Sequence, residues 1–379
     1  MKSIPRFNFT RERFMSGFDG KECKVYPHLV DTGENMFLTY QMLLLSGSDV
    51  FNDLYVVKST DGGKTFGEPE KLRRIETKKD GIRRIFVPAT ECYSKCHKSW
   101  ITFGMTISYA DDKHPVTENG IATGKAGFIL HGEDGQYVGE VQPMELPFKC
   151  ISACPHGQII EYESGEFLVS FYLVPTGETK AKILTVRYKY ENEKLVMVKA
   201  GELLDCPESK RGLCEPSVAK LYDKYYVTLR TDEKGMFAVS DDGYKFSEPM
   251  VWKWEDGREI GNYNTMQRWI RHKDALYLAY TRKGAHNDHI FRHRAPMFMA
   301  RFDEEKMCLI KDTEVILVPE LGARLGNFTV TDISENEFRL VTAEWMQGPK
   351  GKLGECEKYG SDNSIWIAKV EFEEDVGNK

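Results

Sequence analysis

The stretch Ser59-Thr-Asp-Gly-Gly-Lys-Thr-Phe66 decides the fold of this 379-residue chain. Within it, Asp61 can accept hydrogen bonds from the backbone N–H groups of a tight turn, and the two glycines allow the positive φ angles that the turn requires. Phe66 is expected to pack under the neighbouring structural unit. Two further copies, the second of them degenerate, are Ser240-Asp-Asp-Gly-Tyr-Lys-Phe246 and His131-Gly-Glu-Asp-Gly-Gln-Tyr137. These turns predict a chain of β-hairpins.

Six similar segments surround these turns, and each contains a short polar start, an apolar strand, a turn and a second apolar strand. Apolar and polar residues alternate along the strands, and Gly, Asp, Asn or Lys separates them, which is the pattern of a hairpin. The matched starts of the segments are His28, Pro88, His156, Glu215, Gln267 and Asn327. Each step is roughly 50 to 70 residues, which suits one four-stranded blade.

The repeat predicts an all-β fold, a six-bladed β-propeller that forms a single domain over residues 1–379. The last strand, which starts at Ser364, is expected to close the ring beside N-terminal residues. A long β-sandwich or two smaller β domains are the alternatives, but no Pro-, Ser- or Gly-rich linker divides the chain.

The composition narrows the class of protein. Hydrophobic residues make up 41% of the chain, enough for a large core, and the net charge is -6. Because phosphate binding needs clustered Lys and Arg, we expect no nucleic-acid partner. No apolar run reaches the ~20 residues of a membrane span, and no signal peptide is visible after Met1, so no membrane association is expected. The odd number of nine cysteines fits reduced thiols and predicts a cytoplasmic protein.

With the Ser-x-Asp-x-Gly-x-Thr-Phe turn at 59–66, the shorter copy at 240–246 and six repeats, the chain resembles the sialidase superfamily over essentially its whole length. This superfamily comprises the Asp-box, or BNR-repeat, glycosyl hydrolases. The resemblance implies a sialidase-like propeller whose turns lie on the face away from the pocket. It also implies three arginines that hold a substrate carboxylate, a tyrosine nucleophile assisted by a glutamate, and an aspartate acid/base. Arginine suits a carboxylate because its planar fork makes two parallel charge-assisted bonds.

Blade four carries the best match to that active site. Glu215 resembles the assisting glutamate, and Arg230, at the end of the next strand, resembles the second arginine. Asp49, shortly before the first turn, resembles the acid/base. Either Arg292 or Arg294 resembles the third arginine, and the sequence does not choose between them.

Two hallmarks of the family are missing. Where sialidases have Arg-Ile-Pro in the first blade, this chain has Val25-Tyr-Pro27, and Asn327 and Phe328 stand where the last blade should supply the tyrosine. If His28 takes the role of the first arginine, it could instead carry a proton. Tyrosines that could substitute from outside the register are Tyr263, Tyr280 and Tyr359.

Independently of the family, the repeat predicts a polar site around the central axis. The strand starts bring together His28, His156, Glu215, Gln267, Asn264 and Asn327. The ends of the neighbouring strands add Gln41, Arg230, Arg282 and Glu344. Convergent polar groups are costly unless partners, water or a ligand satisfy them, so we expect a polar funnel for a sugar. The alternative is hydrogen bonding between blades that only closes the ring.

The loop after Tyr280 is the stretch richest in His and Arg. It holds Arg282, His286, His289, Arg292, His293 and Arg294. Such a loop is typical of a pocket wall that recognises an anionic or polyhydroxylated ligand, and a histidine there could act as acid or base. The alternative is a solvated loop pinned by His–Asp hydrogen bonds.

Two pairs of cysteines raise the question of a metal site. They are Cys92 with Cys96 and Cys150 with Cys154, each followed by a histidine. Zinc usually takes a closer Cys spacing, and free cysteine is commonly buried as a small apolar group. Core packing is therefore favoured, and no metal or cofactor is expected.

Together these patterns predict a sialidase-like glycoside hydrolase acting on terminal, anionic or decorated sugars of glycans. The predicted catalytic residues are Asp49, Glu215, His28 and His156. The predicted substrate-binding residues are Arg230, Arg282, His289, Arg292, Arg294, Asn264, Gln267, Asn327 and Glu344. One alternative is a propeller polysaccharide lyase that uses His and Tyr to cleave uronate-containing glycans by β-elimination. The other is a non-catalytic sugar-binding propeller.

Overall fold

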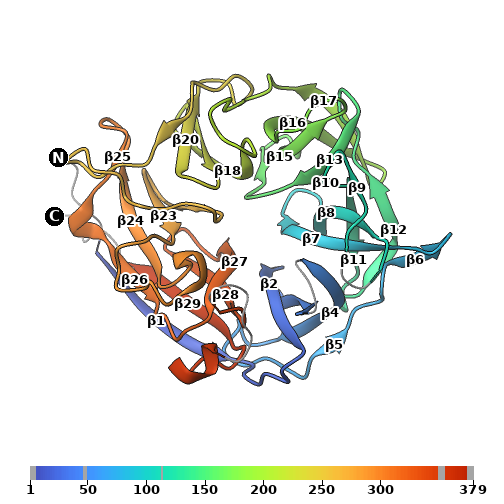
Figure 1. Ribbon diagram of the computed structural model, residues 1–379, viewed down its shortest axis with the longest axis horizontal. Helices are drawn as coiled ribbons and strands as arrows, with labels where there is room; N and C mark the ends of the chain where they lie inside the picture. The colour runs from blue at the N-terminus through green and yellow to red at the C-terminus, as the bar shows by residue number, and fades with distance from the viewer. Residues whose placement is uncertain (1–5, 46–48, 112–113, 349–354, 374–379) are drawn as a thin grey trace.

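Six blades, each of about four β-strands, surround a central axis and close into a ring (Figure 1). The computed structural model describes residues 6–45, 49–111, 114–348 and 355–373. The helices in that part of the chain are short 3-10 segments, and none has the length and apolar character needed to cross a bilayer. The predicted all-β, six-bladed propeller is confirmed.

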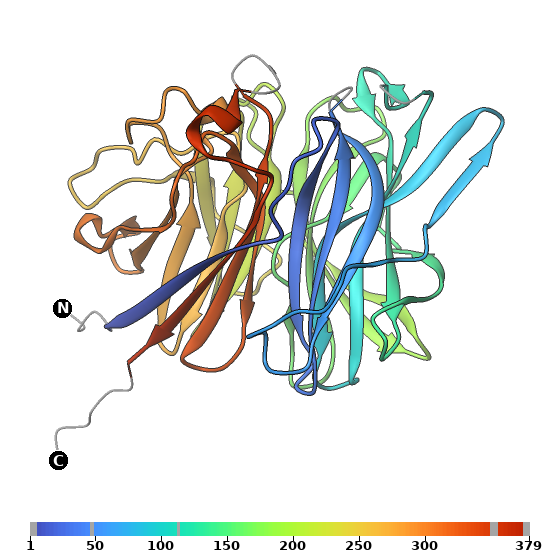
Figure 2. The ribbon, with the colours of Figure 1, turned by 90° about the horizontal axis from the view of Figure 1, so that it is seen from below.

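Blades one and two each begin with a strand beside the axis and proceed outward. Blade one consists of β2 (Glu22–Asp31), β3 (Met36–Leu44), β4 (Val50–Ser59) and β5 (Glu70–Lys71). Blade two consists of β7 (Ile82–Ser94), β8 (Ser99–Tyr109), β11 (Gly124–His131) and β12 (Tyr137–Pro143). Two small hairpins extend it, one formed by β6 (Glu76–Lys79) with the start of β7, the other by β9 (Thr117–Glu118) and β10 (Ile121–Ala122). The β6–β7 arm projects from the ring (Figure 2).

Blades three and four follow the same order. Blade three consists of β13 (Cys150–Pro155), β15 (Phe167–Pro175), β16 (Lys182–Glu191) and β17 (Lys194–Ala200), with the short β14 (Ile160–Glu161) paired to β15. Blade four consists of β18 (Cys214–Leu221), β19 (Lys224–Arg230), β20 (Gly235–Ser240) and β21 (Met250–Val251). A parallel bridge between Gly124 and Ser152 joins the sheets of blades two and three.

Blades five and six complete the ring and carry the 3-10 segments. Blade five consists of β22 (Arg268–His272), β23 (Ala275–Tyr280), β24 (Met297–Asp303) and β26 (Val315–Val318), with β25 (Cys308–Leu309) paired to β24. Blade six consists of β27 (Arg324–Asp332), β28 (Glu337–Trp345), β29 (Ile365–Phe372) and the N-terminal β1 (Phe7–Phe14). The 3-10 segments are η1 (Phe291–His293), η2 (Lys311–Thr313) and η4 (Cys356–Tyr359).

The two ends of the chain close the ring together. Strand β1 pairs antiparallel with β29, from Phe7 opposite Phe372 to Phe14 opposite Ile365. The strands lie side by side in both ribbon views (Figures 1 and 2). The predicted closure of the last strand by N-terminal residues is therefore confirmed, and the edge strand that an open sheet would expose is covered.

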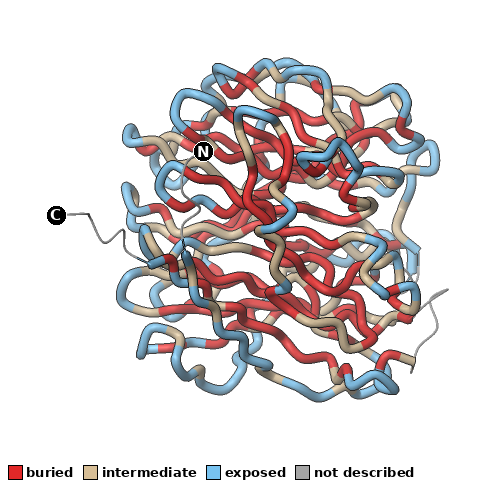
Figure 3. Tube along the Cα trace, turned by 90° about the vertical axis from the view of Figure 1, so that its left-hand side faces the viewer, coloured by how far each residue is buried: buried red, intermediate tan, exposed pale blue. Residues whose placement is uncertain are grey.

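The hydrophobic core lies between neighbouring blades. Leu38 of blade one packs in one cluster with Val341 of blade six, while the rings of Phe237 in blade four and Phe302 in blade five lie 5.6 Å apart. Figure 3 shows that the strands are largely buried and that the exposed residues gather in the turns. The apolar residues of the predicted strands thus stabilise the ring blade against blade, at roughly 25 cal/mol per Å² buried.

The turn at residues 59–66 has the backbone hydrogen bonds that its sequence predicts. Asp61 Oδ1 accepts the backbone N–H of Thr65 at 2.9 Å, and Asp242 makes the same kind of bonds in the second copy. Phe66 packs against Phe14 of the neighbouring blade six, with ring centroids 5.2 Å apart. Side-chain bonds to the turn backbone therefore hold the ends of β4 and β20.

β-Bulges that carry a residue with positive φ interrupt three innermost strands at one end of the ring, which we call the mouth. The bulges in β2, β18 and β27 contain Tyr26, Glu215 and Asn327, whose φ angles are 50°, 47° and 58°. The sequence matched His28 with Glu215, but the strand pairing matches Tyr26 with Glu215, so the predicted register of blade one is wrong by two residues. Positive φ at non-glycine residues is strained and is concentrated at functional sites, which directs attention to the mouth.

Candidate functional site

Glu215 lies at the mouth beside the end of the adjacent strand. The register places Cys214 opposite Arg230, so Arg230 at the end of β19 comes alongside the bulge. Arg230 Nη1 donates a 2.5 Å hydrogen bond to Glu215 Oε1, and both side chains are nearly buried. Asp232 lies 3.5 Å from the other end of the same guanidinium. The predicted neighbours Glu215 and Arg230 therefore form a close ion pair.

The surroundings of Glu215 keep its carboxylate ionised. Burial raises the pKa of Glu215, but the positive charges beside it, foremost that of Arg230, together outweigh burial and lower the pKa to about 2. An ionised carboxylate accepts hydrogen bonds or a proton and has no proton to donate. Glu215 is thus suited to assist a nucleophile through its negative charge, and unsuited to be a general acid.

Asn264 gathers the arginines of the mouth around one amide oxygen. Its Oδ1 accepts hydrogen bonds from Arg230 Nη2 at 2.6 Å, from Arg294 Nη2 at 3.2 Å and from Arg292 Nη1 at 3.4 Å. Its backbone oxygen accepts a further bond from Arg294 Nε at 2.9 Å. Five residues predicted from sequence are thereby brought together, namely Glu215, Arg230, Asn264, Arg292 and Arg294.

Arg324, at the start of β27, adds a cation that the sequence did not single out. Its guanidinium lies over the ring of Trp345 at 3.5 Å and over that of Phe291 at 5.2 Å. Its Nε is buried and has no hydrogen-bond partner among the described residues. Burial, and then repulsion by Arg324 and Arg230, lowers the pKa of Arg294 well below its usual value, so these cations crowd one another.

Tyr26 and Asp49 complete the mouth on the side of blade one. Burial, followed by the charges of Glu215 and Asp49, raises the pKa of Tyr26 well above its usual value. Tyr26 is therefore a protonated phenol at neutral pH, near both carboxylates. Asp49 is exposed at the start of β4, and its backbone oxygen accepts a 2.7 Å hydrogen bond from Tyr109.

The loop rich in His and Arg forms one wall of the mouth through a chain of three side chains. Tyr263 Oη lies 2.6 Å from His293 Nδ1, and His293 Nε2 lies 3.2 Å from Asp288 Oδ1. Since Nε2 can donate to the carboxylate, Nδ1 is left to accept the phenol hydrogen. Arg292 and His293 both have positive φ, of 58° and 52°. The arrangement can take a proton from Tyr263.

His28 and His156, both predicted to be catalytic, are buried inside the ring. Their exposed fractions are 2% and 1%. Burial lowers the pKa of His28 to about 4, and burial together with the charge of Arg268 lowers that of His156 to about 3. His28, Glu91 and Arg268 line a small cavity of about 20 Å³, room for about one water molecule. These neutral, enclosed rings have no surface with which to contact a sugar.

Four other predicted residues have contacts within the protein. Gln267 Oε1 accepts a 2.7 Å bond from the indole of Trp252, and His289 Nε2 lies 3.1 Å from Glu320. Arg282 makes two hydrogen bonds, at 2.8 and 2.7 Å, to Glu314. Gln41 donates to the backbone oxygen of Asn52 at 3.0 Å. The structure does not bring these side chains into the cluster around Asn264. Asn327, in contrast, lies on the β27 bulge, buried but at the mouth.

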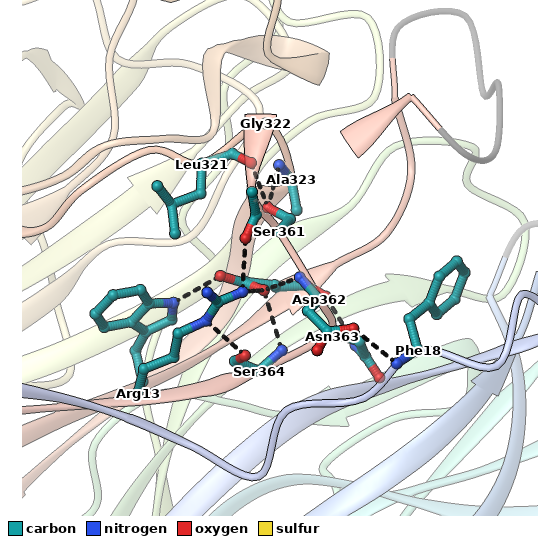
Figure 4. Close-up of polar contacts among 12 residues, drawn as sticks. Arg13, Phe18, Leu321, Gly322, Ala323, Ser361, Asp362, Asn363 and Ser364 are labelled. Carbon is teal, nitrogen blue, oxygen red and sulfur yellow. Dashed lines mark hydrogen bonds and ion pairs between the residues drawn. The ribbon is translucent and has the colours of Figure 1, made fainter. Parts of the chain in front are cut away.

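Glu344, another predicted substrate-binding residue, fastens the closure of the ring. Its Oε2 accepts the backbone N–H groups of Asp362 at 2.7 Å and Ser364 at 3.1 Å, and Arg13 Nη2 at 3.3 Å. Its Oε1 accepts the indole N–H of Trp366 at 2.9 Å. Figure 4 shows Arg13 of β1 reaching this network. Because the carboxylate is buried and accepts four hydrogen bonds within the protein, its position favours a structural role.

Sequence reasoning missed Tyr26 and Arg324 for different reasons. Tyr26-Pro27 repeats the pattern of Glu215-Pro216, so aligning the two prolines would have identified Tyr26. Arg324 precedes the bulge of β27 by a few residues and has no partner motif elsewhere in the chain. It reaches the mouth because Trp345 and Phe291 hold its side chain, which is a tertiary contact.

Comparisons with known proteins agree with the fold. No family model and no curated protein matches the sequence. The NanB sialidase of Streptococcus pneumoniae superposes with a TM-score of 0.61 at 10% identity, covering 96% of this chain and 70% of that chain. The intramolecular trans-sialidase of Ruminococcus gnavus gives 0.60 at 11% identity, with 91% and 94% covered.

A neutral-sugar enzyme shares the architecture as well. The α-L-arabinofuranosidase Arb93A of Fusarium graminearum superposes with a TM-score of 0.55 at 11% identity, covering 94% of this chain and 98% of that chain. Identities this low show the fold alone, and one fold hosts many chemistries. The chain therefore has the six-bladed propeller fold of the sialidases and related propeller glycosidases, as the resemblance implied.

Proposed function

We propose that this protein is a glycoside hydrolase whose substrate is a sugar bearing a carboxylate or a similar anionic group. One observation carries the proposal, the cluster of Arg230, Arg294 and Arg324 buried at the mouth. Among the described residues, only Arg230 of these three lies within ion-pair distance of a carboxylate. The charge of Glu215 partly offsets Arg294 and that of Asp49 partly offsets Arg324, but burial still lowers both pKa values. Buried guanidinium groups that crowd one another favour an anionic ligand.

The other groups of the mouth fit the steps of hydrolysis. The phenol oxygen of Tyr26 attacks the anomeric carbon while Asp49, at the exposed rim, gives a proton to the leaving oxygen. Formation of the O–C bond makes the phenol hydrogen strongly acidic, and the ionised Glu215 receives it as that bond forms. Water then breaks the tyrosyl–sugar bond, Asp49 takes a proton from that water, and the phenol proton returns. A neutral tyrosine suits an anionic sugar, which would repel a carboxylate nucleophile.

The proposal explains the two hallmarks that the sequence lacks. The tyrosine expected in blade six would be supplied by Tyr26 of blade one, and the arginine expected in blade one would be supplied by Arg324 of blade six. The exchange is sterically reasonable because β2 and β27 are neighbours, as the 2.9 Å hydrogen bond from Thr329 Oγ1 to the oxygen of Pro27 shows.

The test is to assay purified protein on terminal sugars and uronate oligosaccharides, with wild type beside Glu215→Gln. We expect reducing ends from wild type and none from the variant. The variant should remain folded, because Arg230 keeps its bonds to Asn264 and Asp232. Turnover retained by Glu215→Gln would remove Glu215 from the mechanism. Ligand binding without turnover, in wild type too, would favour the sugar-binding propeller.

A lyase is the second candidate, and the Tyr263–His293–Asp288 chain favours it specifically. In β-elimination a base removes the proton beside the uronate carboxylate, and an acid protonates the leaving oxygen. Tyr263 and His293 could exchange that proton, with Arg292 and Arg294 on the carboxylate. Absorbance of an unsaturated product, appearing together with the reducing ends, would identify elimination. Reducing ends without absorbance would identify hydrolysis.

We also propose that the protein works in the cytosol. All nine cysteines are free, and several of them, such as Cys23 and Cys154, are buried in the core. Reduced thiols persist in that compartment. Fractionation of cells that produce the protein tests the proposal, which predicts the chain in the soluble cytosolic fraction.

A further inference from the structure

The hydrogen-bond acceptor that the arginines of the mouth share is a neutral amide, that of Asn264. Three guanidinium groups, from Arg230, Arg292 and Arg294, donate to the single Oδ1 of Asn264, and Arg294 also donates to its backbone oxygen. Asn264 has a φ angle of 47°, a conformation that asparagine tolerates better than most residues. The strained backbone directs both oxygens of one residue toward the cations.

An aspartate would be the ordinary partner for three arginines, since a carboxylate forms an ion pair with a guanidinium in addition to its hydrogen bonds. The amide keeps the geometry and adds no negative charge. Among the described residues, neither Arg292 nor Arg294 lies within ion-pair distance of a carboxylate. Glu215 and Asp232 pair with Arg230, and the charge of Glu215 also acts on Arg294. Three guanidinium groups beside these two carboxylates still leave the cluster a positive excess.

We propose that Asn264 is a positioning residue that sets the anion specificity of the mouth by aligning three arginines without neutralising them. The inference rests on the anion site of the proposed function but not on the reaction performed there. It also revises the predicted role of Asn264. Since its Oδ1 is occupied by three donors, the side chain acts on a ligand through Arg230, Arg292 and Arg294.

The decisive variant is Asn264→Asp, which replaces an amide by a carboxylate of the same shape. The control is Asn192→Asp. Asn192 also has a positive φ, of 50°, and lies exposed in the turn between β16 and β17, at the end of the ring opposite the mouth. Both variants add one negative charge to the molecule, but only the first adds it beside the arginines.

Inorganic sulfate is the probe, measured by the rise in melting temperature over sodium chloride at matched ionic strength. Wild type and Asn192→Asp should show the same sulfate-dependent rise. Asn264→Asp should melt higher than wild type without sulfate, because repulsion among the arginines is relieved. Its affinity for sulfate should fall about tenfold or more, a change of about 1.4 kcal/mol. If Asn264 only stabilised the fold, Asn264→Asp would not raise the melting temperature while lowering the affinity for sulfate.

A second variant, Asn264→Ala, removes the acceptor without adding charge. We expect it to melt lower than wild type and to lose sulfate affinity, because the arginines are no longer aligned. The inference is overturned if Asn264→Asp keeps wild-type sulfate affinity, or if wild type gains no stability from sulfate. It is also overturned if Asn264→Asp melts lower than wild type, as Asn264→Ala should.

The same proteins separate this inference from the proposed function. Loss of turnover in Glu215→Gln with unchanged sulfate binding in Asn264→Asp would uphold the hydrolase and reject the role of Asn264. In the opposite case, wild type binds sulfate, Asn264→Asp does not, and wild type turns over no sugar. That result would uphold the role of Asn264 and reject the hydrolase.

Discussion

Two glutamates buried in this ring, Glu215 and Glu91, have pKa values shifted in opposite directions. Glu215 stays ionised because Arg230 lies 2.5 Å away, whereas the hydrogen-bond donors to the buried Glu91 are neutral, namely Thr39, Trp100 and Thr102. Burial raises the pKa of Glu91 to about 7, although its hydrogen bonds lower it. His28 lies 3.9 Å from Glu91, and its own lowered pKa keeps it neutral at pH 7. The charge of a glutamate in this ring therefore depends on how deeply it is buried and on whether its partners are charged.

The raised pKa of Glu91 therefore predicts how the free energy of unfolding changes with pH. Its pKa is higher in the folded chain than in the unfolded chain, so its contribution is complete below about pH 4.5 and is lost as the pH rises through about 7. The loss amounts to roughly 3 kcal/mol by pH 8. Glu91→Gln should remove this loss, so that urea unfolding finds the variant more stable than wild type at pH 8 but not at pH 5.

The control for Glu91 is Glu68→Gln, an exposed residue of blade one. It should change the free energy of unfolding by less than about 0.5 kcal/mol at either pH. Equal effects of Glu91→Gln at pH 5 and pH 8 would show that Glu91 does not change its protonation state over this range.

At the scale of elements, the bulges of the innermost strands place the chemistry. Tyr26, Glu215 and Asn327 occupy the same place in β2, β18 and β27, and each turns the backbone through a positive φ. The alternation of apolar residues predicted the strands well, but a bulge shifts the register within a strand and leaves little trace in the pattern. Proline after Tyr26 and Glu215 was the available signal.

Substitution of Gly157 tests whether the segment that follows β13 holds the β18 bulge in place. It follows β13 with a φ of 85°, and a Cβ atom there would overlap the backbone oxygen of Pro216 and lie 2.6 Å from Ser217 Cα. Gly157→Ala should lower the free energy of unfolding by roughly 3 kcal/mol, of which about 1–2 comes from the left-handed backbone and the rest from overlap. Turnover should fall as well, because Glu215 is displaced.

Gly177→Ala is the matched control, since Gly177 has a φ of 90° and open space around its Cα. Only the backbone cost of about 1–2 kcal/mol applies there, and turnover should stay at the wild-type level. Chemical denaturation and the sugar assay, run side by side on both variants, check the prediction. Equal losses of stability in the two variants would mean that β18 yields to the added methyl group.

At the scale of the molecule, the ring was predictable because its signals are local and repeated. The turns at Asp61 and Asp242 and the alternating strands recur through the chain, and each agrees with the others. The predicted part of the site, from Glu215 and Arg230 to Asn264 and the arginines of the loop after Tyr280, lies in two consecutive blades. Arg324 and Tyr26 meet through the contact of the last blade with the first, which no sequence spacing encodes.

Closure of the ring by the N-terminal strand yields the last prediction. Glu344 is 1% exposed and accepts four hydrogen bonds that join β1, β28 and β29. Glu344→Ala leaves the buried donors without an acceptor and should cost about 3–5 kcal/mol of unfolding free energy. The exposed Glu371→Ala, on β29, should cost less than about 1 kcal/mol.

The same pair of variants decides between the two roles considered for Glu344. If it fastens the ring, urea unfolding shifts to lower concentration, while turnover per folded molecule and KM stay at the wild-type values. If it binds substrate, as the repeat suggested, KM rises and the unfolding midpoint stays near that of Glu371→Ala. The structure favours the first outcome because the carboxylate is buried and already accepts the N–H groups of Asp362, Ser364 and Trp366, so it is not exposed to a sugar hydroxyl.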